Sequence, residues 1–287
     1  MKQIKKVFAV LVLLVMCFSG RAQNVLDRAY TKEHNPYKKP IPYTYLREAD
    51  VMWHHRVWRV IDLREKINFP LYFPTDDAIK DRSALFKIIR NGIAPPDGSP
   101  PKLTAYDSED DEFGIKLNAL QIGKIIAQAD TAYVPSDPTD PSSPLIPKLV
   151  LTNLDANKIK KYWLKEDWFF DKQKSVMEAR IIGIQPIQKA VSGGVEADKG
   201  TFWLYFPELR PLIAKEETFN RHNDAERLTF DDLFWKRQFS GYVFKEFNVY
   251  DNRLIQTYKS GNMLEVLLEA ERIKNSMFTL EHDLWHF

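Results

Sequence analysis

The sequence has almost no cysteine, since Cys17 is the only one among its 287 residues. Cys17 lies within residues 1–22, which have the pattern of a cleavable secretory signal peptide. Removal of that segment would leave a chain that can form neither disulfides nor thiolate metal sites. The whole sequence is 44% hydrophobic and 13% aromatic, so the mature chain can rely on a buried core for its stability.

A long apolar run is also missing. The best candidate, residues 7–18, is shorter than the roughly 20 residues that a membrane-spanning helix needs. Because lysines precede this run and Gly20 and Ala22 follow it, we expect cleavage before Gln23 and no membrane span in the mature chain. The alternatives are a retained membrane anchor and lipid attachment at Cys17, although bulky residues precede this cysteine where a lipidation signal needs small ones.

The sequence lacks an excess of charge of either sign. It has 41 basic and 39 acidic residues, and four of the basic ones lie in the predicted signal peptide. The mature chain would therefore carry 37 basic and 39 acidic residues, a net charge of −2. This balance argues against the basic surface that nucleic-acid binding requires, so we expect no nucleic-acid partner.

Catalytic motifs are scarce. The sequence has no phosphate-binding glycine loop and no Gly-x-Ser-x-Gly elbow. His282 and His286 are candidate metal ligands, because residues four apart share one face of a helix. Since the sequence indicates no third zinc ligand, packing of Trp285 and Phe287 on the core is the simpler interpretation. We expect no catalytic, cofactor or metal site; a metallohydrolase using this histidine pair and a glycan-binding module are the alternatives.

Apolar periodicity predicts mostly helices. Spacings of three and four residues indicate helices over residues 50–66, 74–91, 117–127, 155–171, 207–214, 229–247 and 261–284. An edge strand is expected over residues 102–106, and residues 176–187 and 201–206 should pair as antiparallel strands. Five large side chains should lie mainly in the core: Trp53, Trp58, Phe202, Trp203 and Trp235. The sequence therefore predicts an α+β fold, mostly helical with a small antiparallel sheet and no disulfides.

Changes in composition divide the sequence into five segments. Residues 130–147 hold five prolines among serine, aspartate and threonine, which is typical of a linker or a long surface loop. The predicted order is a signal peptide (1–22), an extended Pro/Tyr-rich N-terminal arm (23–48), a helical first part (49–129), this Pro-rich linker or loop (130–147) and an α+β second part (148–287).

The predicted arm contains candidate partner-binding residues. It shows no helical or alternating period, and its prolines are interleaved with Tyr37, Tyr43 and Tyr45. Tyrosine provides a large apolar ring with a polar tip and is enriched at protein interfaces. We therefore propose these three tyrosines as partner-binding residues, with a disordered leader as the alternative.

Four segments resemble the GldN/PorN proteins of gliding motility and type IX secretion. They are DVMWHHRVWRVIDLREK (residues 50–66, followed by Asn68 and Pro70), FWLYFPELR (202–210), TFDDLF (229–234) and EHDLWHF (281–287). These strings follow one another through nearly the whole mature chain. The predicted arm and residues 130–147 carry no part of the resemblance.

The resemblance implies a non-enzymatic structural subunit of the periplasm, associated with the inner face of the outer membrane. It implies assembly with an outer-membrane lipoprotein, GldK/PorK, into a ring and contact with the periplasmic part of the motor protein GldM/PorM. It supplies no catalytic residues and no cofactor.

Overall fold

The computed structural model describes residues 37–75, 82–135, 145–192, 195–221, 223, 225–259 and 262–283. The predicted signal peptide, residues 23–36 of the predicted arm and His286 lie outside the described residues. Within these described ranges, no helix is both long enough and apolar enough to cross a bilayer.

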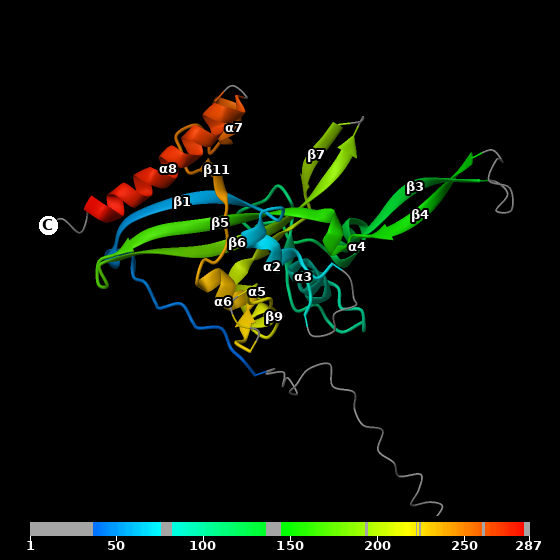
Figure 1. Ribbon diagram of the computed structural model, residues 1–287, viewed down its shortest axis with the longest axis horizontal. Coiled ribbons are helices and arrows are strands. Elements are labelled where there is room, and N and C mark those ends of the chain that lie inside the picture. The colour runs from blue at the N-terminus through cyan, green and yellow to red at the C-terminus, as the bar shows by residue number, and fades with distance from the viewer. Residues whose placement is uncertain are drawn as a thin grey trace, which may run out of the picture. The chain divides into compact units, whose positions relative to one another are not determined.

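A seven-stranded antiparallel sheet forms the centre of the fold (Figure 1). Its strands follow the order β11-β1-β5-β6-β8-β2, and β7 pairs with β6 as a branch. They are β1 (Val51–Asp62), β2 (Ala105–Tyr106), β5 (Ile159–Asp171), β6 (Val176–Ser192), β7 (Val195–Gly200), β8 (Trp203–Tyr205) and β11 (Tyr242–Glu246). Two further hairpins join β3 (Ala127–Pro135) to β4 (Leu145–Asn153) and β9 (Glu217–Thr218) to β10 (Leu228–Thr229). The prediction of a mostly helical fold with a small sheet is therefore wrong.

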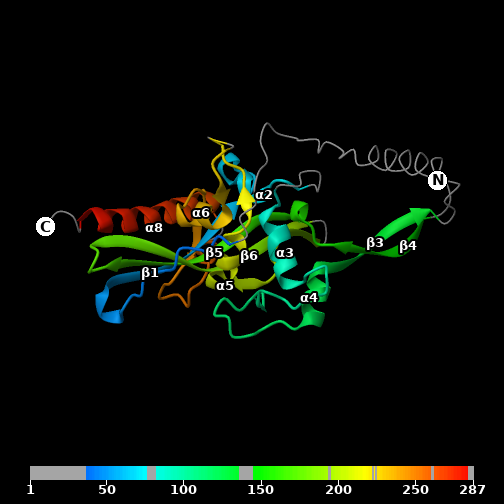
Figure 2. The ribbon, with the colours of Figure 1, turned by 90° about the horizontal axis from the view of Figure 1, so that it is seen from below.

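The helices are short, apart from the last one, which is the long helix seen in both views (Figures 1 and 2) and packs against β11. They are α2 (Phe69–Tyr72), α3 (Leu85–Ile93), α4 (Ala119–Ile126), α5 (Phe206–Ile213), α6 (Phe230–Trp235), α7 (Ile255–Tyr258) and α8 (Met263–Asp283). Three 3-10 turns complete the described elements: η1 (Glu48–Asp50), η2 (Lys66–Asn68) and η3 (Ala156–Lys158). The predicted helices over 117–127, 207–214 and 261–284 are confirmed as α4, α5 and α8. The helix predicted over 74–91 is confirmed from Leu85 onward; residues 82–84 are not helical, and residues 76–81 lie outside the described part of the chain.

The largest error concerns residues 50–66 and 155–171, which form strands β1 and β5 instead of helices. These strands pair antiparallel from Val51 opposite Asp171 to Asp62 opposite Lys161. Both faces of β1 are covered, since all residues from Val57 to Ile61 are buried. A strand buried on both faces has a nearly continuous apolar run, so it also shows apolar residues at helical spacings.

Residues 229–247 contain the short helix α6 and the strand β11 instead of one helix. Helix α6 ends at Trp235, and Arg237 has a φ of 51°, in the left-handed region where helices commonly end. The amide of Gln238 then donates to the carbonyl of Leu233 at 2.9 Å, and the chain continues as β11. The predicted strands are present in the structure: β2 is an edge strand, and β6 pairs antiparallel with β8 as expected.

The buried apolar residues form two clusters. The large cluster lies between the sheet and α3, α5 and α6; it includes Ile61, Leu164 and Phe234. The small cluster holds α7 and α8 against β1 and β11 and includes Val57 and Met277. Of the five large side chains expected in the core, Trp58, Phe202 and Trp203 are buried and Trp53 is partly buried; Trp235 is 44% exposed, so this prediction is wrong for Trp235.

The predicted division of the chain at residues 130–147 remains a prediction. Strands β3 and β4 pair across this segment, from Ala127 opposite Asn153 to Pro135 opposite Leu145. Residues 136–144, between these strands, lie outside the described part of the chain.

Candidate interaction surface

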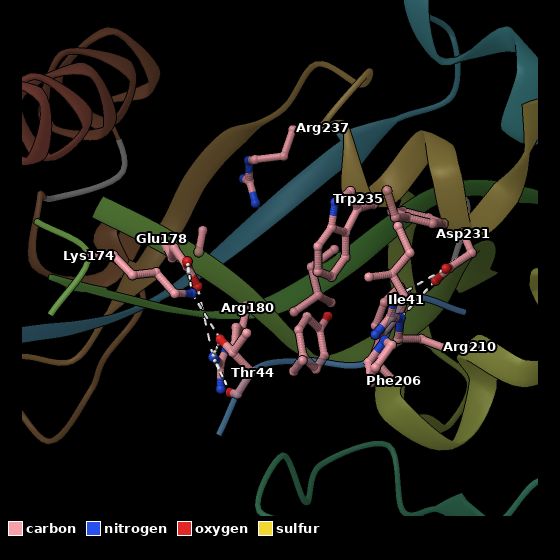
Figure 3. A pocket seen from close by; sticks show the side chains of 15 residues that line it. Ile41, Thr44, Lys174, Glu178, Arg180, Phe206, Arg210, Asp231, Trp235 and Arg237 are labelled. Atoms are coloured by element: carbon pink, nitrogen blue, oxygen red, sulfur yellow. Dashed lines mark hydrogen bonds and ion pairs between the residues drawn. The ribbon is translucent and has the colours of Figure 1, made fainter. Parts of the chain in front are cut away.

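Residues 37–47, termed the strap, are the described end of the predicted arm and form neither helix nor strand. Pro40 and Pro42 fix φ and so reduce the entropy that the strap loses when it docks. Its residues 41–44 lie against β6, α5 and α6, and together with them they line the pocket drawn in Figure 3. The rest of the described chain is termed the body, and its side of this pocket is termed the groove. The groove is lined by Lys174, Glu178, Ala179, Arg180, Ile181, Phe206, Arg210, Asp231, Phe234, Trp235 and Arg237.

Tyr43 is the central contact between the strap and the groove. Its ring stacks on Trp235 with centroids 5.5 Å apart. The Arg210 guanidinium carbon lies 4.4 Å from the ring centroid of Tyr43, and that of Arg180 lies 5.1 Å from it. Burial raises the pKa of the Tyr43 hydroxyl, and the positive charge of Arg210 offsets this only in part. Tyr43 therefore docks as a neutral ring held by stacking and cation–π contacts.

A buried ion pair forms the floor below Tyr43. Arg210 on α5 donates two hydrogen bonds to the Asp231 carboxylate on α6, from Nε at 2.7 Å and from Nη2 at 3.1 Å. Their side chains are only 5% and 6% exposed. Figure 3 shows the pair beside the strap residue Ile41. The two helices thereby fix the orientation of the guanidinium plane on which Tyr43 lies.

The next strap residue, Thr44, is bound by two cations from β6 and the turn before it. Arg180 Nη2 donates to the Thr44 carbonyl at 2.8 Å, and Lys174 Nζ donates to the Thr44 hydroxyl at 2.9 Å. Lys174 also forms an ion pair with Glu178 at 2.7 Å (Figure 3). The guanidinium of Arg180 lies between Tyr43 and Phe169, whose ring centroid is 4.9 Å away. Hydrogen bonds and cation–π contacts thus connect the strap to the body.

Lys38 forms a second attachment at the start of α6. Its Nζ donates to Thr229 Oγ1 at 3.2 Å and forms an ion pair with Asp232. Thr229 and Asp232 also cap this helix reciprocally. Burial raises the pKa of Asp232, but Lys38 and Thr229 outweigh this and lower the pKa overall. The carboxylate therefore stays charged and can hold the strap.

The structure places the three candidate tyrosines differently. Tyr43 lies in the groove, whereas Tyr37 and Tyr45 are 86% and 90% exposed. All three had the same signal in the sequence, namely a tyrosine near prolines. Only the positions of α5 and α6 distinguish the docked ring from the exposed ones.

The histidines do not assemble a metal site within the described residues. His282 lies in the last turn of α8 with Nδ1 3.8 Å from its neighbour Asp283. No group of three or more His, Cys, Asp or Glu side chains in the described ranges could hold a metal ion. His54 and His55 approach different carboxylates, Asp167 at 3.4 Å and Glu246 at 3.2 Å.

The structure contains a buried charge cluster that was not predicted from the sequence. Glu166 of β5 is fully buried and accepts hydrogen bonds from Arg237 Nη2 at 2.8 Å, from Arg59 Nε at 3.3 Å and from Trp168 Nε1 at 3.0 Å. Arg59 lies between Val57 of the small cluster and Ile61 of the large cluster on the same face of β1. The ion cluster therefore separates the two apolar clusters and connects β1, β5 and the end of α6.

In the comparison with known protein families, residues 46–286 match the family described as "Gliding motility associated protein GldN". The chain belongs to the GldN family. GldN proteins are structural components of the gliding motility and type IX secretion machinery. No match was found among curated proteins. The groove residues on β6, α5 and α6 lie inside the matched range, and strap residues 37–45 precede it.

The docking of the GldN strap should depend on Tyr43. Tyr43→Ala removes one aromatic stack and two cation–π contacts, which together are worth roughly 1–2 kcal/mol at such a partly exposed site. Cleavage within residues 38–46 by a non-specific protease is therefore expected to become about tenfold faster, while the sheet stays uncleaved. Tyr45→Ala is the matched control and should change neither; equal protection in both variants would contradict this role of Tyr43.

Proposed function

We propose that this chain is a non-enzymatic structural subunit of the periplasm, associated with the inner face of the outer membrane. It assembles there with an outer-membrane lipoprotein of the GldK/PorK type into a ring, and it contacts the periplasmic part of the motor protein GldM/PorM. The family match over residues 46–286 is the observation that supports this best.

The proposed mechanism is passive transmission of force through a rigid body. The antiparallel sheet connects distant parts of the described chain. The buried Arg210–Asp231 pair joins α5 to α6, and the Glu166 cluster joins Arg237, just after α6, to strands β1 and β5. A subunit with such internal connections keeps its binding surfaces at constant separation. The surfaces can then bridge an anchored ring and an energised motor without a chemical step.

The exposed tyrosines of the strap are the proposed contact with the lipoprotein. Tyr37 and Tyr45 present large rings to solvent on either side of the docked Tyr43. Aromatic side chains that are exposed in one partner supply much of the binding energy when an interface buries them. The docked strap would hold both rings in a defined orientation before the lipoprotein binds.

The experiment is a pull-down of the tagged mature chain from detergent-solubilised envelope, followed by sizing and imaging of the particle. A membrane lipoprotein in a large ring-shaped particle is the expected result, and a small monomer without a partner would overturn the proposal. The double variant Tyr37→Ala/Tyr45→Ala should recover less lipoprotein, while Tyr242→Ala, at a half-exposed tyrosine on β11, should recover the wild-type amount. Equal recovery from all three proteins would refute the tyrosine contact alone.

A further inference from the structure

The contacts between strap and groove are made almost entirely by side chains. In the described part of the chain, no backbone–backbone hydrogen bond joins residues 38–46 to the body, and the Thr44 carbonyl accepts only from the Arg180 side chain. The strap is held at two points, by Lys38 at the start of α6 and by Tyr43 with Thr44 in the groove. Such contacts depend only on the sequence of the strap. An identical strap from a second copy would make the same ones.

The last residues of the strap connect its docked part to the body. Asp50 is fixed to the body, because its carbonyl accepts a hydrogen bond from the Lys172 amide at 2.9 Å. Arg47 belongs to this fixed end, since it forms an ion pair with Asp50 at 2.7 Å and its carbonyl accepts from the Asp50 amide. Tyr45, which lies between the docked Thr44 and this fixed end, is exposed. A change of backbone direction at residues 45–46 would therefore move the docked part of the strap as a unit and would leave η1 and β1 in place. A few exposed residues that absorb a change in φ and ψ are what a hinge requires.

The groove also borders an open edge of the sheet. Strand β6 pairs with β8 only at Gly183 and Ile184 and with β7 only from Ile187 onward. Residues 176–181 of β6 therefore pair with β5 on one side and have no strand on the other within the described chain. An uncovered edge beside an aromatic groove favours uncontrolled association, so a released strap has to be replaced.

We propose that, in the assembled ring, the strap of each copy docks in the groove of the neighbouring copy. This inference rests on the proposed ring, and it identifies the surface through which neighbouring copies join. Head-to-tail exchange fits a closed ring, because every copy gives one strap and receives one, so no groove stays empty. In the free chain, the strap makes these same contacts with its own body.

The test is a cross-link between two copies that carry different tags. One copy has Lys38→Cys and the other has Asp232→Cys, at positions whose native side chains form an ion pair. Both also carry Cys17→Ala, which removes the only native cysteine. The copies are expressed together in cells that make the lipoprotein and are treated with a short bismaleimide. A product with both tags is expected. A single copy that carries both cysteines is tested alongside. The proposal is overturned if this copy cross-links within one chain while the two differently tagged copies give no joint product.

Two controls make this result specific. Pairing Lys38→Cys with Glu271→Cys, an exposed position on α8, should give no product with both tags. Adding Tyr43→Ala to the strap donor should lower the yield of that product about tenfold, whereas adding Tyr45→Ala should not. An unchanged yield with Tyr43→Ala would mean that the link does not report docking in the groove.

The same cells separate the two proposals, because sizing of the lipoprotein particle reports ring formation independently. A ring without a product carrying both tags overturns strap exchange and leaves the ring intact. A product with both tags but no ring supports exchange and overturns the proposed assembly. Absence of both overturns both.

Discussion

Replacing Glu166 by glutamine is expected to lower the free energy of unfolding by about 3–5 kcal/mol, because it leaves buried arginine charge without a counter-charge. Glu166 is fully buried and binds both Arg59 and Arg237, of which Arg59 is itself almost completely buried. Glutamine keeps the size of the side chain and an acceptor for Trp168 but removes the negative charge. Urea denaturation of both proteins at neutral pH, followed by tryptophan fluorescence, measures the difference.

The pH dependence of this difference has a definite sign. Burial raises the pKa of Glu166, but Arg237 and Arg59 outweigh it, so the pKa lies below its ordinary value of 4.5. As pH falls through that value, the unfolded chain takes up the proton first, so the contribution of Glu166 to stability declines. The difference in the free energy of unfolding between wild type and Glu166→Gln should therefore be largest at neutral pH and shrink below about pH 4.5.

The matched control is Glu271→Gln on α8. Glu271 forms an ion pair with Lys274 at 3.8 Å, and its side chain is 59% exposed. Because solvent screens such pairs, its loss should change the free energy of unfolding by no more than about 0.5 kcal/mol. A similar loss of stability in both variants would show that the buried cluster is not a special stabilising element.

The sequence predicted elements well where one element has one exposed face. Helix α8 is an example, because its buried residues Val266, Ala270, Ile273 and Met277 recur at helical spacing while the opposite face meets solvent. Strand β1 lacks that contrast, because its residues from Val57 to Ile61 are buried on both sides. Its β-branched and aromatic composition is typical of a strand, whereas the spacing of its apolar residues is typical of a helix. Burial on the second face arises from distant segments and has no local signal.

Two charges of the buried cluster stand out in the sequence, but their pairing does not. Arg59 interrupts an apolar run in β1, and Glu166 stands among aromatic residues of β5, so each is a charge where burial is expected. Their pairing joins residues 107 positions apart, and Arg237 is 71 positions from Glu166. One sequence does not indicate which of its many charges meet. The same limit applies to the strap, because the groove for Tyr43 exists only after α5 and α6 pack together.

Replacing Arg210 by methionine should have an effect of similar size, about 3–5 kcal/mol, because Asp231 would remain as a buried carboxylate without its partner. The variant should also loosen the strap, since Tyr43 loses the closest of its two guanidinium contacts. Urea denaturation measures the first effect, and the rate of proteolytic cleavage within residues 38–46 measures the second.

A double variant separates these two roles of Arg210. Arg210→Met/Asp231→Leu replaces the buried pair with apolar groups of similar size, an exchange that is often neutral or stabilising. Most of the lost stability should therefore return, whereas fast proteolytic cleavage of the strap should persist because Tyr43 still lacks the Arg210 cation beside its ring. If strap protection returned together with stability, the guanidinium would matter only for the packing of α5 on α6. Persistent strap opening in a stable protein would instead identify Arg210 as the docking contact of Tyr43.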